Sequence, residues 1–381
     1  MISLNATGIA RDITADLIAR VSLIPVPEPE RATTVHVTPS PSTGESLDGY
    51  AAIVTSTGLI TDTRNVPAVF GCPIDHLEQG DVVAISPRGH VRTLYRRRSR
   101  SNTLFTTDRC NSLCLMCSQP PKTVDDGWRV AELLQLIKLI DPSTEELGIT
   151  GGEPTLLGQG LLDVIAACDD RLPKTALHVL SNGRRFAYSS YARALGDLAH
   201  HDLMVGIPVY SDIGTQHDYV VQARGAFDET IIGLHNLAQA SVPVEIRVVV
   251  HRHTFARLPQ LAEYIYRNLT FAAHVTFMGL EVIGFGKANI ASLWIDPIDY
   301  ADELEAAVLM LSTAGVNVSV YNHQLCTLPV SLWPFSRRSI SDWKNDFAEE
   351  CTACREQTRC GGFFSWNLGA YRSRGIRAVA Q

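Results

Sequence analysis

The hydrophobic pattern between residues 101 and 290 alternates short apolar runs with stretches of helical periodicity. The runs are continuously apolar and rich in β-branched residues, which is typical of strands in a parallel sheet covered by helices. We therefore predict an α/β fold in which strands and helices alternate, as in a TIM-like barrel or an open part of one. The predicted strands are residues 103–107, 146–150, 176–180, 203–209, 244–250 and 274–280.

The two flanking regions follow different patterns. Residues 1–100 combine proline-rich irregular sequence with short β-like runs, and the turn sequence Ser-Pro-Arg-Gly suits a hairpin. A small, mostly-β N-terminal domain is therefore expected before a core domain at 101–290. Residues 291–381 begin with a helical stretch and then become irregular and cysteine-bearing, which indicates a third, C-terminal domain. Cys72 and Cys168 lie in apolar surroundings and are expected to be buried structural thiols.

Composition and charge restrict the partners of the protein. The chain has 381 residues, 45% of them hydrophobic, and a net charge of −7. No basic field points to nucleic acid or an anionic membrane, and the short run at 96–100 is most simply a solvated linker. No segment reaches about 18 apolar residues and no signal peptide is visible, so we expect a cytoplasmic protein. In a reducing compartment, nine cysteines favour metal binding or catalysis over disulfides.

Three cysteines stand close together after the first predicted strand. Cys110, Cys114 and Cys117 have the spacing C-x3-C-x2-C, and functional residues gather where barrel strands end. Three thiolates are too few for a closed structural zinc site. They suit an iron–sulfur cube in which one iron keeps an open coordination position. A zinc site with a distant fourth ligand, or unrelated structural cysteines, would also satisfy the spacing.

This loop resembles the signature of the radical S-adenosylmethionine (SAM) superfamily, and Gly-Gly-Glu-Pro after the second strand is similar to a second motif of that family. The resemblance implies a partial (β/α)6 TIM-like radical SAM barrel with a SAM-binding [4Fe-4S] cluster on the three cysteines. It also implies an external one-electron reductant and reductive cleavage of SAM to a 5′-deoxyadenosyl radical. The residues that the resemblance assigns to SAM binding are Met116, Gly151, Gly152, Glu153, Ser181, Asn182 and Arg224.

Four further cysteines lie in the C-terminal region. Cys351, Cys354 and Cys360 have the spacing C-x2-C-x5-C, and Cys326 precedes them. This arrangement resembles the SPASM and twitch extensions of radical SAM enzymes, which bind auxiliary clusters. No cysteine follows Cys360, so the resemblance implies a twitch-like domain with one second, auxiliary [4Fe-4S] cluster. Four thiolates also suit a structural zinc ion, and this alternative stays open.

A narrower resemblance concerns the substrate. The sequence "RCNSLCLMCSQPPK", the β-like N-terminal region and "MGLEVIGFGKAN" are similar to radical SAM maturases of the His-Xaa-Ser system, the HxsC type. This implies modification of a ribosomally made peptide or protein at an unactivated carbon, with a second radical SAM protein as a potential partner. One alternative is a radical SAM enzyme acting on a small molecule or nucleotide. Another is a non-catalytic zinc-binding interaction protein.

Overall fold

The computed structural model describes residues 4–40, 46–58, 66–338, 346–367 and 371–380. The chain forms two compact units. The second unit contains every cysteine except Cys72 and Cys168. The predicted domain boundaries near residues 100 and 290 stay predictions, because the two units are built from interleaved segments. The first unit is Met1–Leu104, Trp128–Leu147 and Ala167–Thr175, and the second is Phe105–Gly127, Gly148–Ala166 and Ala176–Gln381.

The first unit contains an eight-stranded sheet in the order β1-β8-β7-β3-β4-β5-β6-β2. The outer strands β1 (Asn5–Thr7) and β2 (Ile9–Arg11) are separated in sequence by Gly8 alone, so the sheet closes on itself and leaves no open edge there. A Cβ atom at Gly8 would lie 2.4 Å from the carbonyl oxygen of Phe70, which explains the glycine. The other strands are β3 (Leu17–Ser22), β4 (Thr34–Thr38), β5 (Ala52–Thr55), β6 (Ala68–Phe70), β7 (Val82–Ile85) and β8 (His90–Tyr95), with helix α1 (Glu28–Arg31) between β3 and β4.

Small and β-branched side chains fill the core of this closed sheet, among them Val21, Val37 and Val83. The predicted hairpin is present: β7 and β8 pair antiparallel, and the amide of Gly89 donates to the carbonyl of Ser86 (2.9 Å). Cys72 is completely buried in this core, and burial raises the pKa of its thiol to about 11. It is therefore a structural thiol, as its apolar surroundings indicate.

Helix α2 (Arg129–Ile137) and the segment after it belong to the same first unit. Arg92 of β8 forms an ion pair with Glu132 of α2 (2.5 Å), and the hydroxyl of Tyr95 lies 2.8 Å from that of Thr144. Arg97, in the basic run, forms an ion pair with Asp141 (2.7 Å). At least one residue of the basic run at 96–100 therefore forms an ion pair inside the first unit, and is not only part of a solvated linker.

A seven-stranded sheet in the order β15-β14-β13-β12-β11-β10-β9 carries the α/β part of the chain, and neighbouring strands from β11 to β15 pair in parallel. This confirms the predicted α/β fold with a partial TIM-like barrel. Three predicted strands have the bounds expected, and the others differ by one or two residues. The strands are β9 (Asn102–Phe105), β10 (Glu146–Thr150), β11 (Ala176–Leu180), β12 (Leu203–Pro208), β13 (Val244–Val250), β14 (His274–Gly279) and β15 (Val318–Tyr321).

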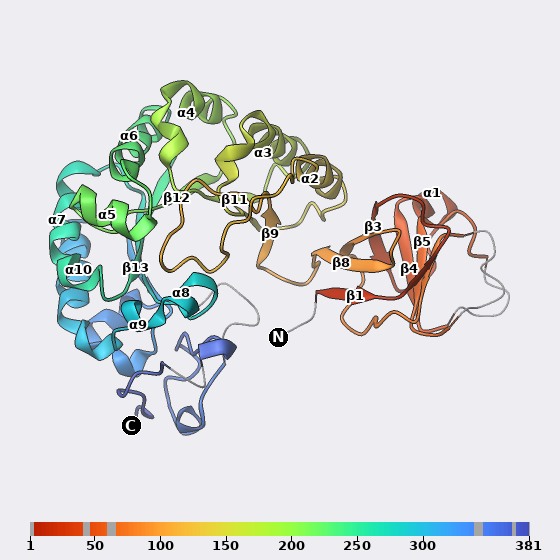
Figure 1. Ribbon diagram of the computed structural model, residues 1–381. Coiled ribbons are helices and arrows are strands. Elements are labelled where there is room, and N and C mark those ends of the chain that lie inside the picture. The colour runs from red at the N-terminus through yellow and green to blue at the C-terminus, as the bar shows by residue number, and fades with distance from the viewer. Residues whose placement is uncertain (1–3, 41–45, 59–65, 339–345, 368–370, 381) are drawn as a thin grey trace. The chain divides into compact units, whose positions relative to one another are not determined.

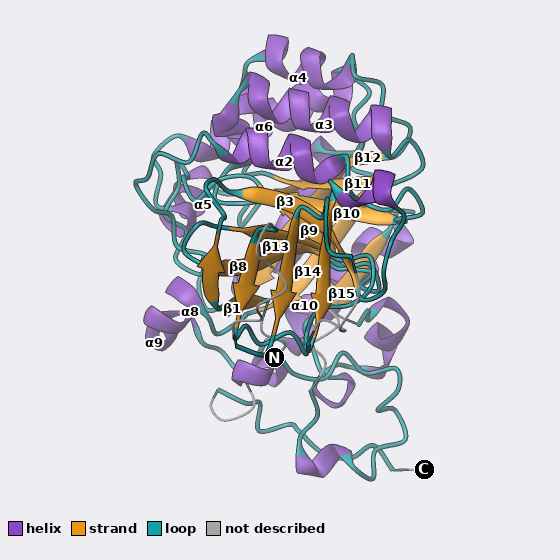
Figure 2. Cartoon of the chain, turned by 90° about the vertical axis from the view of Figure 1, so that its right-hand side faces the viewer, coloured by secondary structure: helices purple, strands orange, loops and turns teal. Residues whose placement is uncertain are grey.

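Helices connect these strands and cover one face of the sheet (Figures 1 and 2). The face of β13 that meets helices consists of the completely or almost completely buried Val244, Ile246, Val248 and Val250. No helix in the described part of the chain is both long and apolar enough to cross a membrane. The helices are α3 (Gln159–Arg171), α4 (Ser189–Gly196), α5 (Gly214–Val221), α6 (Ala226–Gln239), α7 (Leu258–Asn268), α8 (Gly284–Ala288), α9 (Ile290–Leu293) and α10 (Ala301–Thr313).

Candidate functional site

The cysteine loop, residues 108–122, follows β9 and is closed at its base by one buried carboxylate. Asp126 is 2% exposed and accepts hydrogen bonds from the hydroxyl of Thr107 (2.8 Å), the amide of Asp108 (2.6 Å) and Nε of Arg109 (3.1 Å). Lys122, at the far end of the loop, forms an ion pair with Asp108 (3.0 Å). The two ends of the loop are thereby fixed to each other.

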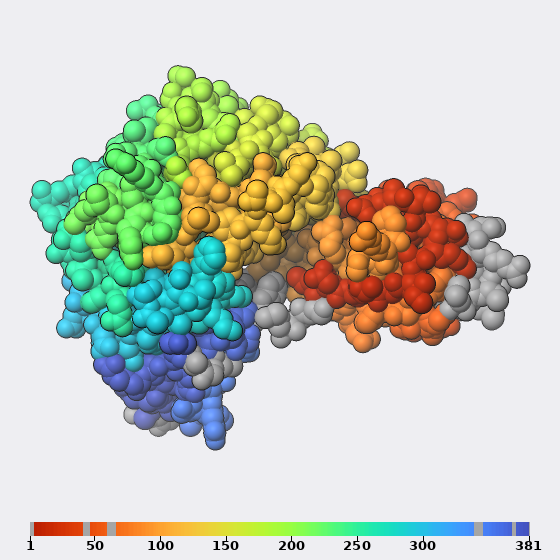
Figure 3. All heavy atoms as spheres, in the orientation of Figure 1, coloured from red at the N-terminus to blue at the C-terminus, as the bar shows by residue number. Residues whose placement is uncertain are grey.

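Two helices fix the middle of the cysteine loop. The amides of Leu113 and Leu115 donate to carbonyls at the end of α5 (3.0 Å each). On the other side, the amide of Phe285 in α8 donates to the carbonyl of Cys117 (2.8 Å), and the two segments lie side by side in Figure 3, cyan against orange. Gly284 has a φ of 57° and a Cβ atom there would lie 2.5 Å from the Cys117 carbonyl oxygen, so this contact requires glycine.

The three thiols of this loop interact with one another. Burial, and to a lesser extent the neighbouring thiols, raise the pKa of Cys110 to about 11 and that of Cys114 to about 12. Burial also raises the pKa of Cys117. Among the described residues, no three His, Cys, Asp or Glu side chains form a group arranged to hold a metal ion. A zinc ion needs all its donors around one point, whereas the thiolates of an iron–sulfur cube bind different irons. The donor set of three thiols on one loop fits the cube.

The two glycines after β10 are required by the contact between loops. A Cβ atom at Gly151 would lie 2.6 Å from the carbonyl oxygen of Thr107, and one at Gly152 would lie 2.2 Å from that of Arg109. The amide of Gly152 donates to Thr107 (2.7 Å), and that of Glu153 donates to Arg109 (2.8 Å). The Gly-Gly-Glu segment is thus bonded by its backbone to the start of the cysteine loop.

Glu153 joins the ends of β10 and β11. Its completely buried carboxylate accepts from the amide and hydroxyl of Thr155 (3.0 and 2.6 Å), the hydroxyl of Ser181 (2.8 Å) and the amide of Asn182 (2.6 Å). Burial raises the pKa of Glu153, and these hydrogen bonds oppose that rise. Three predicted SAM-binding residues, Glu153, Ser181 and Asn182, are therefore in direct contact with one another. Of these four hydrogen bonds, only the one from the Asn182 amide goes to Oε2 of Glu153. A carboxylate oxygen can accept two hydrogen bonds, so Oε2 can accept one more.

Arg184, which the sequence did not single out, reaches from the third strand end to the cysteine loop. Its Nη1 donates to the carbonyl of Asn111 and to the hydroxyl of Ser112, and its Nε forms an ion pair with Glu229 (2.6 Å). The side-chain amide of Asn182 donates to Asn111 as well (2.6 Å). The segment between Cys110 and Cys114 is therefore held by groups that follow β11.

Two of the predicted SAM-binding residues, Arg224 and Met116, lie outside the hydrogen-bond network of Glu153. Arg224 is exposed in the turn before α6, and its contact with SAM stays a prediction. Met116 is 7% exposed and belongs to an apolar cluster with Tyr210 and Val220, so its side chain is part of the core beneath the loop. Asp218, in the same region, accepts hydrogen bonds from the amides at the start of α6 and orders that turn.

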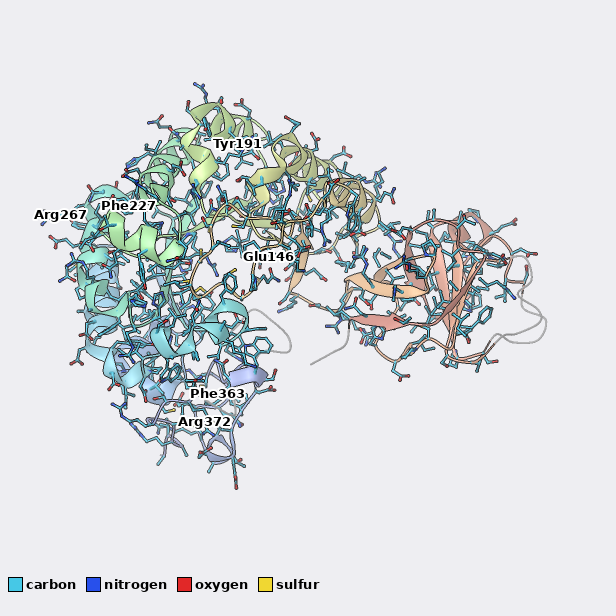
Figure 4. The ribbon with its side chains drawn as sticks, viewed as in Figure 1. Glu146, Tyr191, Phe227, Arg267, Phe363 and Arg372 are labelled. Atoms are coloured by element: carbon cyan, nitrogen blue, oxygen red, sulfur yellow. The ribbon has the colours of Figure 1, made fainter. Side chains whose placement is uncertain are left out.

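The four C-terminal cysteines line one pocket. The amide of Leu325 donates to Sγ of Cys360 (3.5 Å), and the amide of Val379 donates to Sγ of Cys354 (3.4 Å). Phe363 and Arg372 lie in the same C-terminal region (Figure 4), with the Arg372 guanidinium 5.6 Å from the ring centroid. The residues lining the pocket are Gln324, Leu325, Cys326, Phe347, Cys351, Cys354, Glu356, Gln357, Cys360, Gly362, Arg377 and Val379.

The fold and this site define a class: a partial α/β barrel with a cysteine loop fixed at the carboxyl ends of its strands. Residues 104–265 match the family model described as the radical SAM superfamily. The chain therefore carries a radical SAM superfamily domain. That family implies SAM and a [4Fe-4S] cluster as cofactors.

Individual relatives are distant. GTP 3',8-cyclase from Petrotoga mobilis is 23% identical over 192 residues, covering 49% of this chain and 56% of that protein. The structure of SuiB from Streptococcus suis bound to S-adenosylmethionine has a TM-score of 0.46 at 14% identity, covering 59% of this chain and 51% of that one. The structure of anSMEcpe with bound AdoMet has a TM-score of 0.45 at 18% identity, covering 58% and 61%. The chain thus spans between about half and three fifths of the length of these relatives.

Proposed function

We propose that the protein is a radical SAM enzyme, with a [4Fe-4S] cluster on Cys110, Cys114 and Cys117 and SAM bound beside it. The observation that best supports this is the fixation of the cysteine loop at the carboxyl ends of three strands, through Asp126 and the Glu153 network. When bound, the cluster and SAM would supply a 5′-deoxyadenosyl radical that abstracts hydrogen from an unactivated carbon.

The chain's own residues position these cofactors. Gly151 and Gly152 admit the close contact between the two loops, and a larger residue at either would separate them. Glu153 holds Ser181 and Asn182 in place, and its Oε2 retains acceptor capacity for the ammonium group of SAM. The apolar cluster around Met116 excludes water from the underside of the loop.

The test of this proposal is the reductive cleavage of SAM. Anaerobically reconstituted protein, supplied with SAM and dithionite, is expected to form 5′-deoxyadenosine. The matched control replaces Cys110, Cys114 and Cys117 by alanine and leaves the C-terminal cysteines intact. Equal amounts of 5′-deoxyadenosine from both proteins would refute the proposal.

We further propose that Cys326, Cys351, Cys354 and Cys360 hold an auxiliary [4Fe-4S] cluster in a twitch-like domain. The convergence of the four thiols on one pocket supports a shared inorganic centre, and four thiolates also suit zinc. Iron, sulfide and zinc analysis of the Cys110/Cys114/Cys117 triple alanine variant separates the two. Iron with sulfide is expected, and zinc alone would show a structural site instead.

For the substrate, we propose a ribosomally made peptide or protein, modified in a His-Xaa-Ser maturation system. The sequence around Cys117 and the second cysteine pocket support this. An external one-electron reductant and a second radical SAM protein are the proposed partners. The proposal expects a peptide with His-Xaa-Ser repeats to stimulate formation of 5′-deoxyadenosine and to gain a change in mass.

A nucleotide substrate is the second candidate, because the curated relative at 23% identity is a GTP 3',8-cyclase. Parallel assays with GTP and with the His-Xaa-Ser peptide distinguish the two. Stimulation of SAM cleavage by GTP alone would favour the nucleotide. Stimulation by the peptide alone would favour the maturase.

A further inference from the structure

A group of polar and charged side chains lies on the face of the sheet opposite the buried valines of β13. Barrel interiors are ordinarily filled by apolar, branched side chains. Charged side chains at these positions are therefore unusual and point to a role other than packing. Along β13 the residues alternate, and Glu245 and Arg247 face away from the buried side. The members of this group, which we call the inner cluster, are His178 of β11, Glu245 and Arg247 of β13, His274 of β14 and Ser319 of β15.

Glu245 is the centre of the inner cluster. Its side chain is 7% exposed and accepts hydrogen bonds from Arg247 and from Nδ1 of His274 (3.0 Å), whose Nε2 lies 2.9 Å from the hydroxyl of Ser319. Burial favours a raised pKa, but the His274 hydrogen bond and the charge of Arg247 outweigh it and lower the pKa of Glu245 to about 2. Glu245 is therefore ionised at neutral pH and compensates the charge of Arg247.

Arg247 itself is only partly engaged. Its other hydrogen bond in the described part of the chain runs from Nη2 to the thioether sulfur of Met278 (3.2 Å), which is a weak acceptor. Its side chain is 23% exposed, so solvent reaches the guanidinium. A guanidinium offers more N–H donors than these two bonds use, arranged in a plane that matches a carboxylate.

The position of Arg247 relates it to the cysteine loop. Nη1 of Arg247 meets Glu245, the second residue of β13, while Nη2 meets Met278, the penultimate residue of β14, so the Nη2 edge of the guanidinium faces the carboxyl ends of the strands. The amide of Val209, which follows β12, donates to the backbone carbonyl of Arg247 (3.1 Å), and the next residue, Tyr210, packs in the apolar cluster with Met116 and Cys114. Tyr210 thus lies near both groups. A ligand held by Arg247 would lie beside the proposed cofactors.

We propose that Arg247 binds a carboxylate of the substrate, with Glu245 and His274 as positioning residues that fix the guanidinium. The substrate class is then a peptide that presents an acidic side chain or a C-terminal carboxylate. This inference rests on the proposed function, because it assigns a substrate to the same radical SAM site. The carboxylate of SAM is the competing ligand for Arg247, and the test below distinguishes it by measuring the affinity for SAM on the same variants.

The test compares two blocked amino acids as probes, acetyl-glutamate amide and acetyl-glutamine amide, which differ only in the side-chain carboxylate. Binding to the anaerobically reconstituted holoenzyme with SAM is followed by saturation-transfer NMR and calorimetry. We expect at least a fivefold preference for the glutamate probe. Arg247→Met should abolish that preference, and Arg247→Lys should reduce it, because lysine makes no bidentate contact.

Two further variants keep the test decisive. Arg247→Met leaves the buried Glu245 without the cation that compensates its charge, which destabilises proteins. The double variant Glu245→Gln/Arg247→Met removes both charges together and should also lose the preference. Arg267→Met is the matched control, since Arg267 pairs with Glu263 (2.6 Å) on the outer surface of α7 (Figure 4) and should retain the preference.

Each outcome has a defined meaning. A preference that persists in a folded Arg247→Met or double variant would overturn the inference. A loss of SAM affinity that parallels the loss of the preference would identify the SAM carboxylate as the ligand and overturn it too. Formation of 5′-deoxyadenosine by the wild-type protein is measured on the same samples. If the wild-type protein cleaves SAM but shows no preference, the inference fails and the proposed function stands.

Discussion

At the scale of single residues, Asp125 and Asp126 show that burial cannot be predicted from residue type and position in the sequence alone. They are adjacent and identical in type, yet Asp125 is exposed and Asp126 is buried under the cysteine loop. The spacing of Cys110, Cys114 and Cys117 is a local property and can be read directly. The partners of Asp126 and Arg184 depend on which segments the fold brings together, so one sequence alone could not reveal them.

Replacing Asp126 should loosen the first cysteine site. Asp126→Asn removes the charge that Arg109 faces and weakens the bonds to Thr107 and Asp108, at a cost of roughly 2 kcal/mol. We expect less iron bound after reconstitution and an earlier urea midpoint. Asp125→Asn is the matched control and should behave like wild type. Unchanged iron content in Asp126→Asn would contradict the proposed function of this carboxylate.

Buried histidines should make the second unit sensitive to acid. Burial lowers the pKa of His217 to about 4, and its Nδ1 accepts a hydrogen bond from the amide of Tyr210 (3.2 Å). The unfolded chain binds this proton near pH 6.5, so stability is present above that pH and is lost as pH falls toward 4. A shift of this size corresponds to roughly 3 kcal/mol at most.

The variant His217→Asn tests this, because an amide oxygen can accept the Tyr210 hydrogen bond without binding a proton in this range. Urea unfolding at pH 7 and pH 5 should show a smaller loss of stability in this variant than in wild type. His201→Asn, at an exposed position, is the control and should retain the full pH dependence. Identical pH slopes in His217→Asn and wild type would exclude His217 as the source.

At the scale of elements, the sequence is informative where apolar runs are continuous. The strands β10, β11 and β13 have the predicted bounds because each run is covered by helices and ends at polar residues or glycine. Strand β15 was missed, since it has four residues and carries Ser319 in its middle. It exists through its pairing with β14, which is a tertiary contact.

The C-terminal tail is an element whose contribution only the structure reveals. Asp296 accepts hydrogen bonds from Ser373 and from the amide of Arg374 (2.9 Å), and this fixes the tail beside the second cysteine pocket. The amide of Val379 then donates to Sγ of Cys354. Hydrogen bonds to sulfur stabilise the reduced, more negative state of an iron–sulfur cluster and so raise its reduction potential.

Val379→Pro should therefore lower the reduction potential of the proposed auxiliary cluster. Proline removes this single N–H, and about 1 kcal/mol corresponds to roughly 40 mV for one electron. Val379→Ala keeps the N–H and serves as the control. The potential is measured by EPR-monitored titration in the Cys110/Cys114/Cys117 triple alanine background, where one cluster remains. Equal potentials in the two variants would rule out this hydrogen bond as a determinant.

At the scale of the whole molecule, the sequence predicted a mostly-β N-terminal region but not how its contacts extend. Strands β1 to β8 form a closed sheet, and the same unit includes α2 from the following core region. The ion pair between Arg92 and Glu132 illustrates why a boundary at residue 100 cannot be read from composition alone. Contacts across a long sequence separation decide which segments belong together.

The first unit exposes two apolar side chains directly after β3. Leu23 and Ile24 are adjacent and 45% and 63% exposed, which offers a surface for apolar side chains of a peptide substrate. If the N-terminal unit recognises the substrate, Leu23→Ser/Ile24→Ser should weaken binding of a His-Xaa-Ser peptide about tenfold, in keeping with the apolar area lost. Fluorescence anisotropy of the labelled peptide measures this, while 5′-deoxyadenosine formation without peptide should persist because the cysteine loop lies in the other unit. Tyr188→Ser, which alters an apolar residue 71% exposed in the second unit, is the control. Equal peptide affinity in the double variant and wild type would assign recognition to the second unit alone.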